Sequence, residues 1–168
     1  SSERVRRAAA SYRTEVAYPP TPLGAALRDV AALIAAEIGT RVFSVELGSF
    51  DTHTSQIADH DNLMRTLDGA LGAFLEDLER TQAGRATAVL AYSEFGRRVR
   101  ENGTAGTDHG LAGPVLLAGP QVRGGLYGAH PSFEELDEGD LAHTTDFRRV
   151  YATVIERWFE ADAKAVLG

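Results

Sequence analysis

Hydrophobic residues recur at helical spacing in three parts of the chain, and each part predicts an amphipathic helix. The first begins at Thr21-Pro22, a typical helix start, and runs to Gly39. The second ends near Gly84, and the third begins at Thr145 or Asp146 as its cap. The apolar stripes are Leu23, Leu27, Val30, Leu33, Ile34 and Ile38; Leu63, Met64, Leu67, Leu71, Phe74, Leu75 and Leu78; and Phe147, Val150, Tyr151, Val154, Ile155, Trp158 and Phe159.

Short runs of β-forming residues alternate with these helices. Residues 41–47 (Arg-Val-Phe-Ser-Val-Glu-Leu) and 87–92 (Thr-Ala-Val-Leu-Ala-Tyr) are expected strands, and 114–118 is a third apolar run. Because the second helix joins the first two strands, we expect a right-handed crossover with parallel strands. The pattern predicts one α/β domain over residues 21–168, preceded by an irregular lead-in over residues 1–20.

Polar residues with chemical potential follow the expected strands. Asp51 and His53 come just after the first strand, Glu94 and Arg97 after the second, and Asp108-His109 lies in a glycine-rich loop. The carboxyl ends of strands in open α/β sheets are where ligands bind. Oxygen and imidazole ligands suit zinc, manganese or calcium, and such an ion can assist hydrolysis. The alternative is that these side chains only cap helices and shape turns.

Other candidates favour ordinary structural roles. His60, His130 and His143 have no neighbouring motif that requires a function. The acidic run 134–140 is expected to be a solvated loop, with a calcium site as the alternative. Arg97-Arg98 is by default a solvated pair, with anion binding as the other interpretation.

Composition limits the classes of function. The 168 residues carry a formal net charge of −7, which argues against nucleic acid as a partner. The absence of cysteine excludes thiolate ligands and a cysteine nucleophile. No apolar run of 18 or more residues predicts a membrane span, and no signal peptide is recognisable. The start at Ser1-Ser2 without methionine suggests a processed or trimmed chain.

Six ordered motifs together resemble one known family. They are Gly48-Ser49-Phe50-Asp51-Thr52-His53 with Gln56, Phe74-Leu75-Glu76-Asp77-Leu78, Ser93-Glu94-Phe95-Gly96-Arg97, Gly106-Thr107-Asp108-His109-Gly110, Gly124-Gly125-Leu126-Tyr127-Gly128, and Thr144-Thr145-Asp146-Phe147-Arg148-Arg149-Val150-Tyr151. This combination resembles domain-of-unknown-function family 1501 (DUF1501), which looks like a branch of the alkaline phosphatase and sulfatase superfamily. The resemblance covers residues 20–168 and implies the C-terminal portion of the family domain.

The resemblance implies a fold and a site. The fold would be an alkaline-phosphatase-like sandwich of helices around a largely parallel sheet, incomplete at its N-terminus. Asp51, His53 and His109 would bind a metal, with Asp108 as a further ligand or orienting group. Glu94 stands where the superfamily has an Asp followed by His, and Phe95 replaces that His, so a mononuclear or altered site is as plausible as a two-metal site.

The resemblance also bears on what surrounds the chain. The superfamily takes its nucleophile and one metal carboxylate from an N-terminal strand, which would lie upstream of Ser1. The local hydroxyls of Thr52, Ser93 and Thr107 carry no mark of an activated nucleophile. Related chains carry leaders that resemble export signals, which implies a periplasmic or exported protein.

These observations support a leading hypothesis and two rivals. The first is a metal-dependent hydrolase of phosphate or sulfate esters, with Glu94 and Arg97 acting on a small anionic substrate. The second is a non-catalytic binding or assembly protein that retains the scaffold, since a fold does not determine activity. The third is that the polar residues only shape loops. The oligomeric state stays open.

Overall fold

The computed structural model describes residues 2–168, which form two compact units. The first unit comprises the described residues up to Tyr92 together with Glu101–Asp108 and Val115–Gly124. The second comprises Ser93–Arg100, His109–Pro114 and Gly125–Gly168. That residues 21–168 form a single domain stays a prediction from the sequence pattern.

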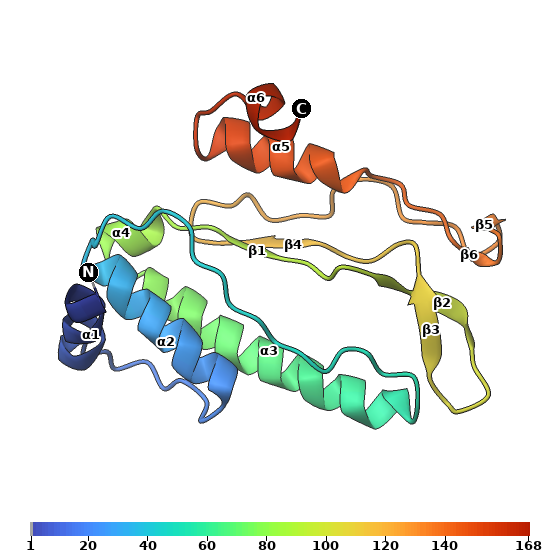
Figure 1. Ribbon diagram of the computed structural model, residues 1–168, viewed down its shortest axis with the longest axis horizontal. Helices are drawn as coiled ribbons and strands as arrows, with labels where there is room; N and C mark the ends of the chain where they lie inside the picture. The colour runs from blue at the N-terminus through green and yellow to red at the C-terminus, as the bar shows by residue number, and fades with distance from the viewer. Residues whose placement is uncertain (1) are drawn as a thin grey trace. The chain divides into compact units, whose positions relative to one another are not determined.

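The first unit holds four helices, α1 (Ser2–Ser11), α2 (Pro22–Ala35), α3 (Gln56–Leu78) and α4 (Gln82–Arg85) (Figure 1). The expected start of α2 is confirmed, because the Thr21 hydroxyl accepts a hydrogen bond from the Gly24 N–H at 3.0 Å and Pro22 occupies the first turn. Helix α3 begins before the apolar stripe that predicted it. Its first turns are largely exposed, so the hydrophobic pattern did not mark them.

The hydrophobic core of this unit lies between α2 and α3. Its buried members are Leu23, Leu27, Ala31, Ile34, Ala70, Phe74 and Leu78. All seven belong to the two predicted stripes or lie beside them on the same helical faces. The amphipathic spacing therefore identified the principal core of the protein.

Helix α1 corrects the expected irregular lead-in. Residues 2–11 form a regular helix, in which Ala8 is buried and Arg7 pairs with Glu3 one turn away at 3.2 Å. The segment has few large apolar residues, so it lacks the stripe that marked α2. Its alanines and arginines are nevertheless strong helix formers, and this local preference explains the helix.

The strand expected over residues 41–47 is not formed. This segment has no strand assignment, and Val42 is 70% exposed. Phe43 and Leu47 pack against the α2–α3 core. These two partly buried side chains contact the helices, while Val42 and Val45 stay exposed, and the segment forms no backbone ladder.

The parallel pairing expected between the first two strands is not formed, and an antiparallel pair takes its place. β1 (Val89–Ala91) forms an antiparallel pair with β4 (Leu116–Ala118), in which Leu90 lies opposite Leu117. The third apolar run thus supplies the partner of the second. Within the described residues the protein is mixed helix and strand, and no parallel sheet is formed.

A buried carboxylate fixes the chain between α1 and α2 onto α3. Asp77 is 1% exposed and accepts hydrogen bonds from the hydroxyls of Thr14 at 2.6 Å and Tyr18 at 2.9 Å. The guanidinium of Arg80 lies 3.8 Å away. Burial and hydrogen bonding to Asp77 raise the pKa of Tyr12 to about 12, and the same causes raise the pKa of Tyr18.

The second unit contains a small hairpin and two helices. β5 (Leu136–Asp137) pairs antiparallel with β6 (Asp140–Leu141), so the expected solvated acidic loop is in part a hairpin. Its turn residues Glu138 and Gly139 both have positive φ, as a type I′ hairpin turn requires. Helices α5 (Phe147–Arg157) and α6 (Ala163–Leu167) follow.

The start of α5 confirms the expected cap. The Asp146 carboxylate accepts a hydrogen bond from the Arg148 N–H at 2.9 Å. Strands β2 (Gly96–Glu101) and β3 (Thr107–Gly110) form a two-stranded sheet whose turn end, 101–108, belongs to the first unit. No helix within residues 2–168 is long and apolar enough to cross a membrane.

Candidate metal centre

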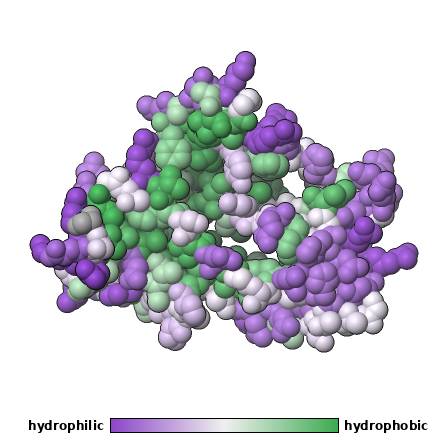
Figure 2. Space-filling view, in the orientation of Figure 1, coloured by the Kyte–Doolittle hydropathy of each residue, from purple (hydrophilic) through white to green (hydrophobic). Residues whose placement is uncertain are grey.

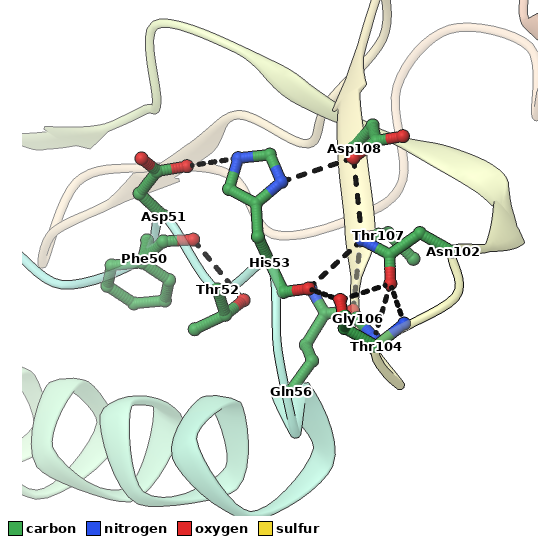
Figure 3. A network of polar contacts seen from close by, with 10 residues as sticks. All are labelled: Phe50, Asp51, Thr52, His53, Gln56, Asn102, Thr104, Gly106, Thr107 and Asp108. Atoms are coloured by element: carbon green, nitrogen blue, oxygen red, sulfur yellow. Dashed lines mark hydrogen bonds and ion pairs between the residues drawn. The ribbon is translucent and has the colours of Figure 1, made fainter.

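The imidazole of His53 lies between two carboxylates (Figure 3). Its Nε2 is 2.9 Å from Asp51 Oδ1, and its Nδ1 is 3.2 Å from Asp108 Oδ1. The His53 side chain is 41% exposed and both aspartates are 62% exposed, so solvent and ions can reach the group. Asp51 and His53 are close in the sequence, whereas Asp108, which the family resemblance implies as a further ligand or orienting group, reaches the same imidazole from a position 55 residues away.

This arrangement has a definite hydrogen-bonding limit. A neutral imidazole donates from only one ring nitrogen, so only one of the two carboxylates can accept an N–H hydrogen bond from it. The other nitrogen then faces an oxygen with a lone pair. A proton or a metal ion can bridge such a pair of acceptors, and the geometry is open to either.

The distance between Asp51 and His53 can be compared with that between two ligands of one metal ion. Two ligand atoms held about 2.1 Å from one tetrahedral ion lie roughly 3.4 Å apart. The 2.9 Å separation of Asp51 Oδ1 and His53 Nε2 needs only a small adjustment to reach that value. Carboxylate oxygen and imidazole nitrogen also form a donor set that zinc or manganese accepts.

The backbone of His53 is held from the hairpin turn between β2 and β3. Its carbonyl oxygen accepts hydrogen bonds from the Thr104 hydroxyl at 2.7 Å and from the Asn102 side-chain amide at 3.0 Å. On the following residues, the N–H groups of Ser55 and Gln56 donate to the carbonyls of Thr104 and Ala105. The loop that carries Asp51 and His53 is thereby fixed to the turn that leads to Asp108.

Asn102 organises that turn. Its side-chain oxygen accepts hydrogen bonds from the N–H groups of Thr104 at 3.0 Å and Gly106 at 3.1 Å. Its amide nitrogen also lies 3.4 Å from Asp108 Oδ1. One side chain therefore shapes the turn, supports His53 and contacts a carboxylate of the site.

Gly106 allows the two loops to touch. A Cβ placed there would lie 2.3 Å from the carbonyl carbon and oxygen of His53 and 2.7 Å from the Thr54 nitrogen. These are backbone atoms, which have little freedom to move away.

Figure 2 shows hydrophilic and neutral residues over the region where α3 begins, in keeping with the polar character of this loop cluster.

The nearby hydroxyl groups have ordinary partners. The Thr52 hydroxyl donates to the Phe50 carbonyl at 3.4 Å, and the Thr107 hydroxyl donates to Gln56 Oε1 at 3.0 Å. His60 makes an edge contact with the Phe50 ring, with centroids 5.7 Å apart. These contacts describe loop packing and give no hydroxyl the contacts of an activated nucleophile.

The remaining candidates lie in the second unit. His109 is exposed and its ring stacks on Phe95, with centroids 3.8 Å apart. Glu94 is exposed, and the Arg97 guanidinium carbon is 5.2 Å from the Phe95 ring centre. His109 also lines a cavity of about 250 Å³, whose other lining residues are Arg98, Gly110, Leu111, Asp137, Glu138 and Asp140.

Several supporting residues were missed by sequence reasoning. Asn102, Thr104 and Gly106 hold His53, yet they stand in a stretch interpreted only as a glycine-rich loop. The Asn102-Gly103 pair is a recognised turn signal and could have located the hairpin. Its contact with His53 depends on tertiary structure and has no local signal.

A family model described as "Protein of unknown function (DUF1501)" matches residues 2–167. The chain belongs to the DUF1501 family. No curated protein and no solved structure matches it. The match spans Asp51, His53, Asp108 and His109, so the whole candidate site of this DUF1501 chain falls within the family region.

Proposed function

We propose that this DUF1501 chain is the metal-binding part of a metal-dependent hydrolase of phosphate or sulfate esters. The observation that carries the proposal is the Asp51–His53–Asp108 chain of carboxylate, imidazole and carboxylate. The proposal includes kinship with the alkaline phosphatase and sulfatase superfamily, whose fold is a sandwich of helices around a largely parallel sheet. It rests on the donor chemistry and on the resemblance of Asp51, His53 and His109 to the metal-ligand pattern of that superfamily.

The residues present fit a divalent ion. Asp51 and His53 supply one oxygen and one nitrogen at a separation close to that of two ligands on a common ion. Both side chains reach solvent, and their loop is held in place by backbone hydrogen bonds. Asp108 would hold the other ring nitrogen of His53, which fixes the tautomer and ring orientation as carboxylates do for metal-bound histidines.

Further residues complete the proposed site. His109, the residue after Asp108, would supply another imidazole ligand. Arg97 would bind the anionic oxygens of the ester through its guanidinium group, and Glu94 would orient the substrate or exchange a proton with it. A bound divalent ion would supply positive charge that offsets the charge developing on the ester during cleavage.

Hydrolysis of model esters tests this proposal. The purified protein is supplied with zinc, manganese or calcium and assayed with p-nitrophenyl phosphate and p-nitrophenyl sulfate. We expect turnover that falls by about two orders of magnitude or more in Asp51→Asn, as for loss of a major charge-stabilising element. Asp68→Asn, an exposed α3 variant, is the matched control and should keep wild-type activity.

Folding must be followed alongside activity. Circular dichroism of both variants should match wild type, so that lost turnover reports the site. Turnover that survives unchanged in a folded Asp51→Asn protein would contradict the assignment of Asp51.

A non-catalytic binding or assembly role is the second candidate. It is favoured by the fact that both ring nitrogens of His53 already contact carboxylates, which stabilises the loops without any reaction. Metal retention without turnover of any tested ester would support this role. Ester turnover that depends on Asp51 would exclude it.

A further inference from the structure

The His109 imidazole is stacked face to face on the ring of Phe95. The two centroids are 3.8 Å apart and the ring planes differ by 8°. The Arg97 guanidinium carbon lies 5.2 Å from the centre of the same phenyl ring, within the usual range of a cation–π contact. All three residues belong to the second unit.

Two glycines bring the segments of these rings into direct backbone contact. A Cβ at Gly96 would lie 1.8 Å from the Ala112 carbonyl oxygen. A Cβ at Gly110 would lie 2.6 Å from the Arg97 carbonyl carbon. Each glycine is adjacent to one of the stacked residues, so close backbone packing sets the distance between the two rings.

A buried carboxylate fixes the chain just beyond His109. Asp140 is 3% exposed, and its Oδ2 accepts a hydrogen bond from the Leu111 N–H at 2.8 Å. Its Oδ1 accepts from the Leu141 N–H, also at 2.8 Å. The backbone on the C-terminal side of His109 is therefore tied to the β5–β6 hairpin.

We propose that Phe95 is a positioning residue that fixes the plane of the His109 imidazole for metal binding. This inference rests on the proposed function, in which His109 is a ligand. A histidine coordinates a metal with a nitrogen lone pair that lies in the ring plane, so the orientation of the ring decides where the ion can sit. A parallel phenyl ring restricts rotation of the imidazole and contacts its face, whereas coordination takes place at its edge.

The size of the effect follows from the strength of aromatic pairs. Loss of one such contact changes an equilibrium constant by about three- to tenfold. We therefore expect Phe95→Leu, which removes the flat ring, to weaken zinc binding by about that factor. Phe95→Tyr keeps the ring and should stay within about twofold of wild type.

The chain offers a matched control pair. Phe133 and His130 also form an aromatic contact in the second unit, but their ring centroids are 6.0 Å apart and their ring planes differ by 41°. Phe133→Leu should leave zinc affinity unchanged. All variants are measured by competition with a zinc chelator, together with His109→Ala.

Nuclear magnetic resonance gives a readout that does not depend on metal. In the metal-free protein the ring protons of His109 should lie upfield of those of the exposed His143, because they sit over the Phe95 face. Phe95→Leu should remove this shift. If His109 resonates like His143 in the wild-type protein, the stack does not exist and the proposal is overturned, whatever the variants do.

The outcomes separate this inference from the proposed function. If His109→Ala weakens zinc binding but a folded Phe95→Leu does not, Phe95 has no positioning role and the metal site stands. If His109→Ala leaves zinc affinity unchanged, His109 is not a ligand and both statements fail. Weakening in His109→Ala and Phe95→Leu, with recovery in Phe95→Tyr, is the expected result.

Discussion

Replacing Asp77 should destabilise the first unit strongly. Its carboxylate is 1% exposed and joins α3 to the chain between α1 and α2 through Thr14 and Tyr18. Asp77→Ala leaves these hydroxyls without their acceptor, and Asp77→Asn keeps the shape but removes the charge. The two substitutions therefore separate the loss of the network from the loss of charge.

The expected magnitude follows from the hydrogen bonds. A hydrogen bond to a charged group contributes about 1.5–3 kcal/mol, and breaking a buried charged network costs about 3–5 kcal/mol. Both hydroxyl donors are partly buried. We expect Asp77→Ala to lower the free energy of unfolding by about 3–4 kcal/mol and Asp77→Asn by about 2 kcal/mol.

Alkaline pH gives an independent test of the same network. The pKa of Tyr12 is raised to about 12, first by burial and then by hydrogen bonding to Asp77. Tyrosine in the unfolded chain ionises near pH 10. The contribution of Tyr12 to the free energy of unfolding is therefore fully present below about pH 10 and declines as pH rises toward 12. The raised pKa of Tyr18 acts in the same direction.

Urea unfolding followed by far-ultraviolet circular dichroism measures both effects. Glu76→Gln, an exposed neighbour on α3, is the control and should change the free energy by less than about 0.5 kcal/mol. Asp77→Ala should also show a shallower loss of stability above pH 10. Wild-type stability in Asp77→Ala would refute the role assigned to this carboxylate.

Two further substitutions test the hairpin turn and α5. Gly106→Ala should cost about 1–3 kcal/mol and weaken zinc binding, because its Cβ would meet the His53 backbone; Gly103→Ala has open space and should change neither. Equal zinc affinity of Gly106→Ala and Gly103→Ala in a chelator competition assay would contradict the role of Gly106. Asp146→Ala should lower the melting temperature at pH 7, because the helix cap is lost. Hydrogen bonds from Arg148 lower the Asp146 pKa to about 2, so the stabilisation from the charged carboxylate is present above pH 3.8 and is lost as pH falls through 2, and the difference between variant and wild type should shrink there. A thermal difference as large at pH 1.5 as at pH 7 would argue against this pairing.

Local rules explain the parts of the fold that the sequence predicted correctly. Thr21 and Asp146 cap their helices with their own side chains, and the stripes of α2 and α3 meet in the core. Such features depend on residues within one or two turns of each other, so the chain itself carries the signal.

Strand formation depended on partners that no local pattern identifies. Residues 41–47 have β-forming composition, but Phe43 and Leu47 bury themselves on helices, and β1 pairs with Leu116–Ala118 in antiparallel register. β-propensity measures how well a side chain fits a half-buried surface, and a helix pair can offer that surface as well as a sheet.

The candidate site divides in the same way. Asp51 and His53 stand two positions apart, so their contact could be expected from the sequence. Asp108 and Asn102 reach His53 only because the hairpin turn packs on its loop, and that packing requires the absence of a side chain at Gly106.

Metal content of the purified protein tests the central claim most directly. Protein prepared without chelators, and supplied with zinc, manganese or calcium, is measured by elemental analysis beside Asp51→Asn, His53→Ala and His109→Ala. We predict near-stoichiometric metal in wild type and in the exposed control His143→Ala, with loss in the three site variants. Absence of metal in the supplemented wild type, or full retention in Asp51→Asn and His53→Ala, would contradict the proposed metal centre.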